Sequence, residues 1–171
     1  RGENVSVVCV IGGGPAGMMT AAVAAARGKK VVLAEKNNML GKKLLITGKG
    51  RCNITNNADI EDFFKNVPRN SNFLYSAFYS FTNADLIRLL NKLGLETKVE
   101  RGGRIFPVSD KSKDVLNALK KLLAKNGVVL YNSEVADILC DNGKKRVVFA
   151  DKKSLLCDKV VIATGGVSYP S

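Results

Sequence analysis

A glycine-rich turn near the N-terminus constrains the fold of this chain more than any other segment. Residues 12–17 read GGGPAG, which satisfies G-x-G-x-x-G, between an apolar run at residues 5–11 and an alanine-rich stretch at residues 18–27. In such a strand–turn–helix the first glycine permits the tight turn, the second lets the backbone approach a pyrophosphate, and the third lets helix and strand pack closely. The free N–H groups and the positive dipole end of the helix then face the phosphates. The turn predicts a dinucleotide site, formed by Gly12, Gly14, Pro15, Ala16 and Gly17.

A second strand carries the acidic residue that such a site requires. Residues 30–35 read KVVLAE, and together with the preceding strand and helix they predict a βαβ unit with parallel strands and a right-handed crossover. Glu35 ends this strand. A carboxylate there accepts hydrogen bonds from both hydroxyls of an adenosine ribose and repels a 2′-phosphate. The sequence therefore favours a nucleotide without a 2′-phosphate.

The remaining segments predict an α/β fold with three layers. We expect a long functional loop at 37–57, a helix at 72–80, a capping box at Thr82–Asp85 that starts a helix ending at Gly94, and an amphipathic helix at 114–125. Short strands are expected at 128–131, 135–139, 146–150, 155–157 and 159–163, with a turn at 141–143. This pattern indicates a Rossmann-like domain with a parallel central sheet, a small β-meander and a helical insertion at about residues 59–112. We expect the domain to be incomplete at its C-terminus.

Composition excludes several kinds of chemistry. The chain has no histidine, so it lacks the commonest general base and metal ligand. Its four cysteines are far apart and form no CxxC pair, which argues against a zinc site and a disulfide scaffold and favours reduced thiols in a cytoplasmic protein. No apolar run has the length of a membrane span. We expect no metal and no membrane association, and the sequence identifies no catalytic acid or base.

The net charge of +12 attracts polyanions such as nucleic acid. A solvated basic surface is the simpler interpretation, and we favour it over a nucleic-acid partner. We expect a small-molecule substrate; the oligomeric state does not follow from the sequence. A basic nucleic-acid-binding module or an RNA-modifying flavoprotein stays open as an alternative, which steeply salt-dependent binding would support.

The segment GKKLLITGKGRCNITN, residues 41–56, distinguishes between dinucleotides. Its three glycines allow close approach of the backbone to a flat ligand. Lys42, Lys43 and Arg51 offer cations to a phosphate or a reduced flavin, and Asn53 offers polar contacts to a ring edge. A plain NAD site does not need such a loop, so the segment favours FAD, with an NAD-only dehydrogenase as the alternative.

Four motifs together resemble a known family. GGGPAG, GKKLLITGKGRCNITN, GGRIFPVSD at 102–110 and ATGGVSYP at 163–170 resemble the bacterial FAD-dependent oxidoreductases that include aminoacetone oxidase and 3-dehydro-bile-acid reductase. These are two-dinucleotide-binding, glutathione-reductase-like flavoproteins. The resemblance covers nearly the whole chain in the family's order. It implies an FAD-binding domain in which further residues contact the cofactor: Lys36, Lys42, Lys43, Gly50, Arg51, Cys52, Asn53, Val135, Ala163, Thr164 and Gly165.

The resemblance also implies a reaction. The family's members transfer hydride between the flavin and an organic substrate, with NAD(P)H, quinone or oxygen as the other redox partner, so this chain is expected to be part of an NAD(FAD)-utilising dehydrogenase. In the family a second glycine–acid motif and a separate substrate domain follow the ATGG segment. Because this chain contains neither, we expect it to be an N-terminal fragment that is inactive alone.

Overall fold

The computed structural model describes residues 5–166. The chain divides into two compact units, of which the first comprises Arg1–Leu44 with Leu119–Ser171 and the second comprises Leu45–Ala118. The segment that interrupts the first unit is therefore wider than the expected 59–112. No helix within residues 5–166 is long and apolar enough to cross a membrane.

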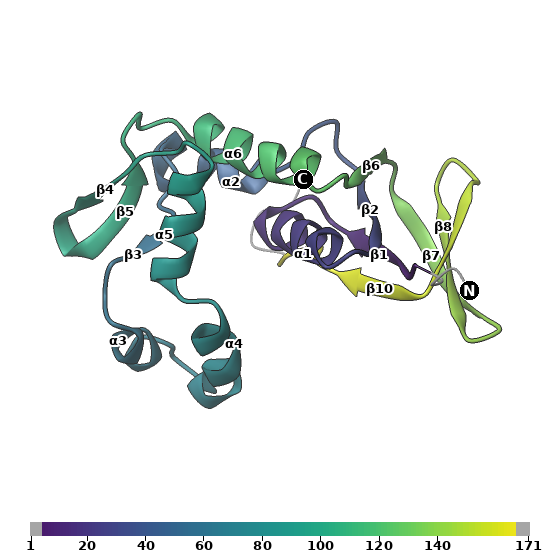
Figure 1. Cartoon of the computed structure of the whole chain (residues 1–171), viewed down its shortest axis with the longest axis horizontal. Helices are drawn as coiled ribbons and strands as arrows, with labels where there is room; N and C mark the ends of the chain where they lie inside the picture. Colours follow the sequence, from purple (N-terminus) through teal and green to yellow (C-terminus); the bar gives the residue numbers. More distant parts are fainter. Residues whose placement is uncertain (1–4, 167–171) are drawn as a thin grey trace. The chain divides into compact units, whose positions relative to one another are not determined.

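A parallel sheet of four strands forms the centre of the first unit (Figure 1). The strands are β1 (Val7–Ile11), β2 (Lys30–Glu35), β6 (Val129–Asn132) and β10 (Lys159–Ile162), in the order β10-β1-β2-β6. β1 lies inside the sheet, and its Cys9 and Val10 side chains are fully buried, as its unbroken apolar run predicts. The expected Rossmann-like parallel sheet is confirmed.

Helix α1 (Pro15–Ala26) connects β1 to β2 and packs on them. It begins three residues before the segment expected to be helical, because Pro15 occupies its first turn, where the missing N–H costs nothing. Gly28 follows the helix with φ of +75°, so glycine permits the chain to reverse toward β2. The residues that α1 buries are small or flexible: Gly17, Met18, Ala21 and Ala22.

A β-meander covers one face of the parallel sheet. Strands β7 (Val135–Asp141), β8 (Lys144–Phe149) and β9 (Ser154–Cys157) pair antiparallel. Asn142 and Gly143 join β7 to β8 with φ of +46° and +80°, which is the two-residue turn that an Asn-Gly pair favours. The meander packs onto the sheet through one buried cluster, formed by Cys9, Ala34, Val147, Phe149 and Cys157. Because side chains alternate along a strand, Val10 and Leu33 point to the opposite face.

The second unit contains strands as well as helices. Its elements are the last residues of α2 (Lys42–Ile46), β3 (Thr55–Asn56), α3 (Ile60–Lys65), α4 (Tyr75–Ser80), α5 (Asn83–Lys92), β4 (Thr97–Glu100), β5 (Arg104–Pro107) and the first half of α6 (Ser112–Lys125). β3, β5 and β4 form an antiparallel sheet in that order. The expected long loop at 37–57 is therefore wrong in part, because α2, a 3₁₀ turn at Thr47–Gly50 and β3 occupy it. The capping box is confirmed, since Thr82 and Asp85 satisfy each other's N–H groups at the start of α5.

Candidate nucleotide-binding site

The glycine turn lies against the end of β10. Gly12 has φ of +107°, and its N–H donates to the Ala34 carbonyl at 2.8 Å. A Cβ atom at Gly12 would lie 2.4 Å from the Ala163 carbonyl oxygen. The Ala163 N–H donates to the Ile11 carbonyl at 2.8 Å, which fixes this approach. The predicted residues Gly12, Ala163 and Thr164 are thus brought together, and only glycine fits between them.

Gly17 lies in a tightly packed part of the turn, whereas Gly14 lies on its open side. A Cβ atom at Gly17 would lie 1.8 Å from the Gly12 carbonyl oxygen, so Gly17 allows the turn to close onto the helix. A Cβ atom at Gly14 would meet nothing within 4 Å, so the turn is open on that side. The first helical bond of α1 runs from Met18 N–H to the Gly14 carbonyl at 2.9 Å. The N–H groups of Ala16 and Gly17 precede this bond, in the position where helix termini bind phosphate.

Glu35 binds the turn directly. Its Oε2 accepts from the Gly13 N–H at 2.6 Å, and its Oε1 accepts from the backbone and side-chain N–H groups of Asn37 at 2.8 and 2.6 Å. A carboxylate offers about four acceptor sites, so one is left for a ribose hydroxyl. The half-buried Glu35 therefore orders the turn, and it keeps one acceptor site where the sequence predicts contacts with both ribose hydroxyls.

Three predicted lysines, Lys36, Lys42 and Lys43, follow the carboxyl end of β2 in the sequence. Lys43, in the first turn of α2, donates its Nζ to the Gly166 carbonyl and so connects α2 to the segment after β10. Gly165 in that segment has φ of +76°. Lys36 and Lys42 are exposed, and the structure shows no ion pair for them among residues 5–166. The rest of the ATGGVSYP motif, residues 167–170, lies outside the described residues.

The predicted residues Gly50, Arg51, Cys52 and Asn53 belong to the second unit. Arg51 is engaged within this unit: its Nε donates to Asp110 at 2.8 Å, its Nη2 pairs with Glu100, and its guanidinium covers the Phe106 ring. Hydrogen bonds to Glu100 and Asp110 raise the pKa of Arg51. These contacts give Arg51 a structural role within the second unit, and its contact with the cofactor stays a prediction.

The neighbours of Arg51 adopt unusual backbone conformations. Cys52 has φ of +62°, Lys49 has φ of +57°, and the Cys52 N–H donates to the Thr47 carbonyl at 2.9 Å. Burial raises the pKa of the Cys52 thiol, so this thiol is not a ready nucleophile. Asn53 is exposed. Non-glycine residues in this region cost free energy and tend to occur where function requires a particular shape.

Val135 begins β7, where it pairs with Phe149 and packs against the cluster that joins meander and sheet. Sequence reasoning missed Asn132, at the end of β6. Its amide donates to the Glu35 carbonyl at 2.9 Å and to the Asn37 carbonyl at 2.7 Å, and so holds the segment that carries Glu35. The sequence feature that could have indicated this role is the asparagine at the carboxyl end of a predicted strand, since Glu35 also ends a strand.

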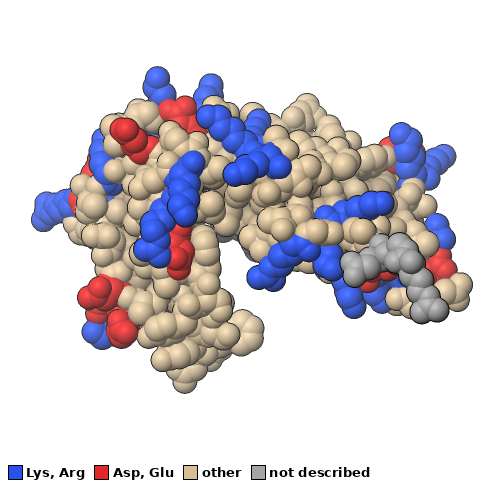
Figure 2. Space-filling model, viewed as in Figure 1, with Lys and Arg blue, Asp and Glu red and all other residues tan. Residues whose placement is uncertain are grey.

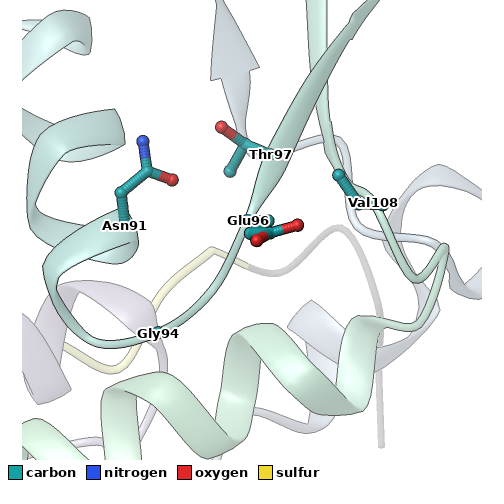
Figure 3. A pocket seen from close by; sticks show the side chains of 5 residues that line it. All are labelled: Asn91, Gly94, Glu96, Thr97 and Val108. Carbon is teal, nitrogen blue, oxygen red and sulfur yellow. The ribbon is translucent and has the colours of Figure 1, made fainter.

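A shallow hollow occurs in the second unit, lined by Asn91, Gly94, Glu96, Thr97 and Val108 (Figure 3). The Asn91 and Thr97 side chains face each other across it. Its charged lining residue is the carboxylate of Glu96, so the hollow does not suit a pyrophosphate.

The chain is similar in sequence to a family of known proteins. The family described as HI0933-like protein Rossmann domain matches residues 6–171. The 3-dehydro-bile acid delta(4,6)-reductase of Clostridium scindens is 36% identical over 166 residues, which cover 95% of this chain and 39% of the relative. The ribosomal RNA dihydrouridine synthase of Escherichia coli is 33% identical over 162 residues, which cover 94% of this chain and 40% of the relative.

A solved structure shares the fold. The crystal structure of Thermovibrio ammonificans THI4 superimposes with a TM-score of 0.60 at 15% identity and covers 94% of this chain and 57% of that protein. The chain spans about two fifths of the length of the two curated relatives above.

Proposed function

This chain belongs to the HI0933-like protein Rossmann domain family, and from that membership we propose that it is the FAD-binding part of an oxidoreductase that reduces a carbon–carbon double bond conjugated to a carbonyl group. Reduced FAD supplies the hydride, and NAD(P)H is the proposed source of electrons. Full activity is proposed to require the longer length of the relatives, of which this chain spans about two fifths.

One observation carries the proposal. The turn at residues 12–17 is closed by Ala163 on one side and Glu35 on another, and it stays open above Gly14. A pyrophosphate would accept from the N–H groups of the first turn of α1, while the ribose would use the remaining acceptor site of Glu35. The residues present thus fit the adenosine diphosphate half of FAD. Lys43 holds the segment after β10 beside this turn.

The reactions for which two relatives are named support this reaction class. A 3-dehydro bile acid with double bonds at positions 4 and 6 is a conjugated ketone, and making dihydrouridine saturates a double bond of uracil that is conjugated to a carbonyl. In both cases the β-carbon is electrophilic and accepts a hydride, and the α-carbon accepts a proton. The 171 residues here include no histidine, so a proton donor from this part of the protein would be another kind of side chain.

The test starts with the cofactor. The purified full-length protein is expected to be yellow, or to turn yellow with added FAD, and to release FAD on denaturation. With the flavin reduced in the absence of oxygen, a 3-oxo-Δ4 steroid or a uridine-containing RNA should reoxidise it, whereas the saturated ketone or dihydrouridine should not. A colourless full-length protein that takes up no FAD would overturn the proposal. Uptake of NAD in place of FAD would favour the NAD-only dehydrogenase.

The two relatives differ in substrate, and one observation favours RNA as the second candidate. The chain carries a net charge of +12, which a neutral steroid ring system does not need and an RNA backbone does.

A further inference from the structure

The positive charge of the chain is unequally divided between its units. Over the printed sequence the first unit has 16 Lys and Arg against 7 Asp and Glu, and the second has 11 against 8. The excess is thus +9 in the first unit and +3 in the second, which together make the +12 of the chain. Lys and Arg side chains recur over the first unit on the face that Figure 2 shows.

The parallel sheet brings several of these cations to one edge. β2 begins at Lys30 and β10 begins at Lys159, and parallel strands begin at the same edge of a sheet. Helix α1 ends just before Arg27, and α6 ends at Lys125. The Asn126 amide donates to the Ala22 carbonyl at 3.3 Å, which ties the ends of the two helices together. We name as the basic edge its five exposed residues: Arg27, Lys29, Lys30, Lys125 and Lys159.

The cations of the basic edge form no close ion pair among residues 5–166, although Lys159 is one of the charges that lower the pKa of the neighbouring Asp158. The structure pairs none of the five with a carboxylate at salt-bridge distance among residues 5–166. Asp158, which precedes Lys159, accepts from the Val7 N–H at 2.7 Å and lies 3.4 Å from the Lys144 ammonium. By contrast, Arg146 and Lys153 on the meander each have an acidic partner. The basic edge thus presents unpaired charge to a ligand.

The position of the basic edge separates it from the cofactor. The glycine turn and Glu35 lie at the carboxyl ends of β1 and β2, whereas the basic edge lies at the amino ends of the strands. About five residues per strand, at about 3.3 Å each, put roughly 15 Å between the two edges. A polyanion on the basic edge would therefore not compete with the FAD pyrophosphate. An RNA is long enough to contact this edge while one base leaves the stack to react elsewhere.

We infer that the basic edge binds the phosphate backbone of a structured RNA, and that this RNA carries the uridine to be reduced. The inference rests on the proposed function in treating RNA as the substrate. RNA binding itself is a separate property that can be measured without turnover. RNA is favoured over an anionic membrane because a relative in the same family is named for a reaction on ribosomal RNA.

The test compares two variants of equal charge. One combines R27Q, K29Q, K125Q and K159Q in the basic edge, and the other combines R69Q, K92Q, K111Q and K113Q. The control residues lie in the second unit, are exposed, and likewise have no ion-pair partner among residues 5–166. Anisotropy of a labelled RNA hairpin gives Kd between about 50 and 200 mM salt. Vesicles with and without an anionic lipid form a second arm.

The basic-edge variant is expected to bind the hairpin at least about tenfold more weakly and to lose about 3 from the slope of log Kd against log salt, since each phosphate contact contributes about 0.7–0.9. The control variant should stay within about threefold of the parent protein. Equal losses in both variants, no loss in either, or preferential binding to anionic vesicles would overturn the inference.

The flavin spectrum distinguishes the two claims. Both variants should keep the FAD absorbance of the parent protein, because none of their substitutions touches the glycine turn. A protein that holds FAD but whose RNA binding ignores the basic edge would contradict this inference alone. A protein that binds RNA through the basic edge but takes up no FAD would contradict the proposed function alone.

Discussion

The guanidinium of Arg51 lies over the ring of Phe106, 4.2 Å from its centroid. Arg51 belongs to the GKGRCN segment and Phe106 to the GGRIFPVSD segment, so this contact joins two motifs that are more than fifty residues apart in the sequence. Asp110, the last residue of the second motif, accepts from the same guanidinium. The two motifs therefore form one structural element, in which a planar cation is stacked and paired at once.

Replacing Arg51 tests this element. Arg51→Lys keeps the charge but loses the planar fork and the stacking, so we expect a clear fall in the Tm of the protein. Arg88→Lys is the matched control, because Arg88 makes a single exposed ion pair with Asp85. The shift in Tm at position 51 should be several times that at position 88. Equal shifts would show that the Phe106 contact adds nothing.

Alanine at two glycines of the turn should give opposite results. Gly17→Ala places Cβ against the Gly12 carbonyl, so we expect a loss of about 3 kcal/mol in the free energy of unfolding. Gly14→Ala meets only open space and should leave unfolding unchanged, yet weaken FAD binding because Cβ occupies the approach of the pyrophosphate. Urea unfolding and FAD titration measure the two effects. Destabilisation by Gly14→Ala would contradict this assignment.

Glu35→Gln should weaken FAD binding and nucleotide discrimination together. The amide of Gln would place a donor against the N–H groups of Gly13 or Asn37, which costs about 1–3 kcal/mol. The variant should also lose the preference for ADP over its 2′-phosphorylated form, since the repelling charge is gone. Competition of each nucleotide with bound FAD measures this, with Glu96→Gln as a control at an acid of the second unit. An unchanged preference would remove Glu35 from the ribose site.

The capping box predicts how α5 responds to acid. Hydrogen bonds from the Thr82 N–H and hydroxyl, and then from Arg88, lower the pKa of Asp85 to about 2. A lowered pKa means stability that is present above the unfolded value near 4 and is lost as pH falls through about 2. Asp85→Asn should therefore lower the urea midpoint at pH 6, and the difference from the parent protein should shrink between pH 4 and pH 2. A difference constant with pH would show that the charge is unimportant.

The cysteines should differ in reactivity. Burial raises the pKa of Cys9 to about 12, with the neighbouring Cys157 as a second cause, and Cys52 is buried as well. Cys140 is exposed. At pH 8 a thiol reagent should label one cysteine rapidly in the folded protein and all four in denaturant. Cys140→Ser should abolish the rapid phase; rapid labelling that survives would indicate that the meander opens.

Local patterns predicted the parts of the fold that depend on local physics. The strand–turn–helix at the N-terminus, the Asn142-Gly143 turn and the Thr82–Asp85 capping box each follow from neighbouring residues. β4 and β5 did not follow, because four-residue strands such as TKVE and RIFP have too little alternation to be distinguished from loop. Their pairing depends on contacts within the second unit.

In the candidate site, too, the sequence predicted the residues whose role depends on local structure and not those whose role depends on long-range contacts. The chemistry of Gly12 and Glu35 could be inferred from their place at strand ends, whereas the role of Asn132 depends on β6 lying beside β2. Arg51 shows the limit most clearly. A basic residue in a glycine-rich loop suggests an anionic ligand, whereas its ion pairs with Glu100 and Asp110 depend on residues about fifty or more positions away and follow only from the structure.

In the sequence, the second unit (Leu45–Ala118) separates the two segments that form the first unit, and this has a consequence for the order in which the chain can fold. β1 and β2 are synthesised first, but β6 and β10, which flank them, come after the whole second unit. During synthesis the two early strands must therefore wait with unpaired edges while the contiguous second unit can already form. The Gly12 turn reaches its final surroundings only when Ala163 has been synthesised, although the turn itself precedes the whole second unit in the sequence.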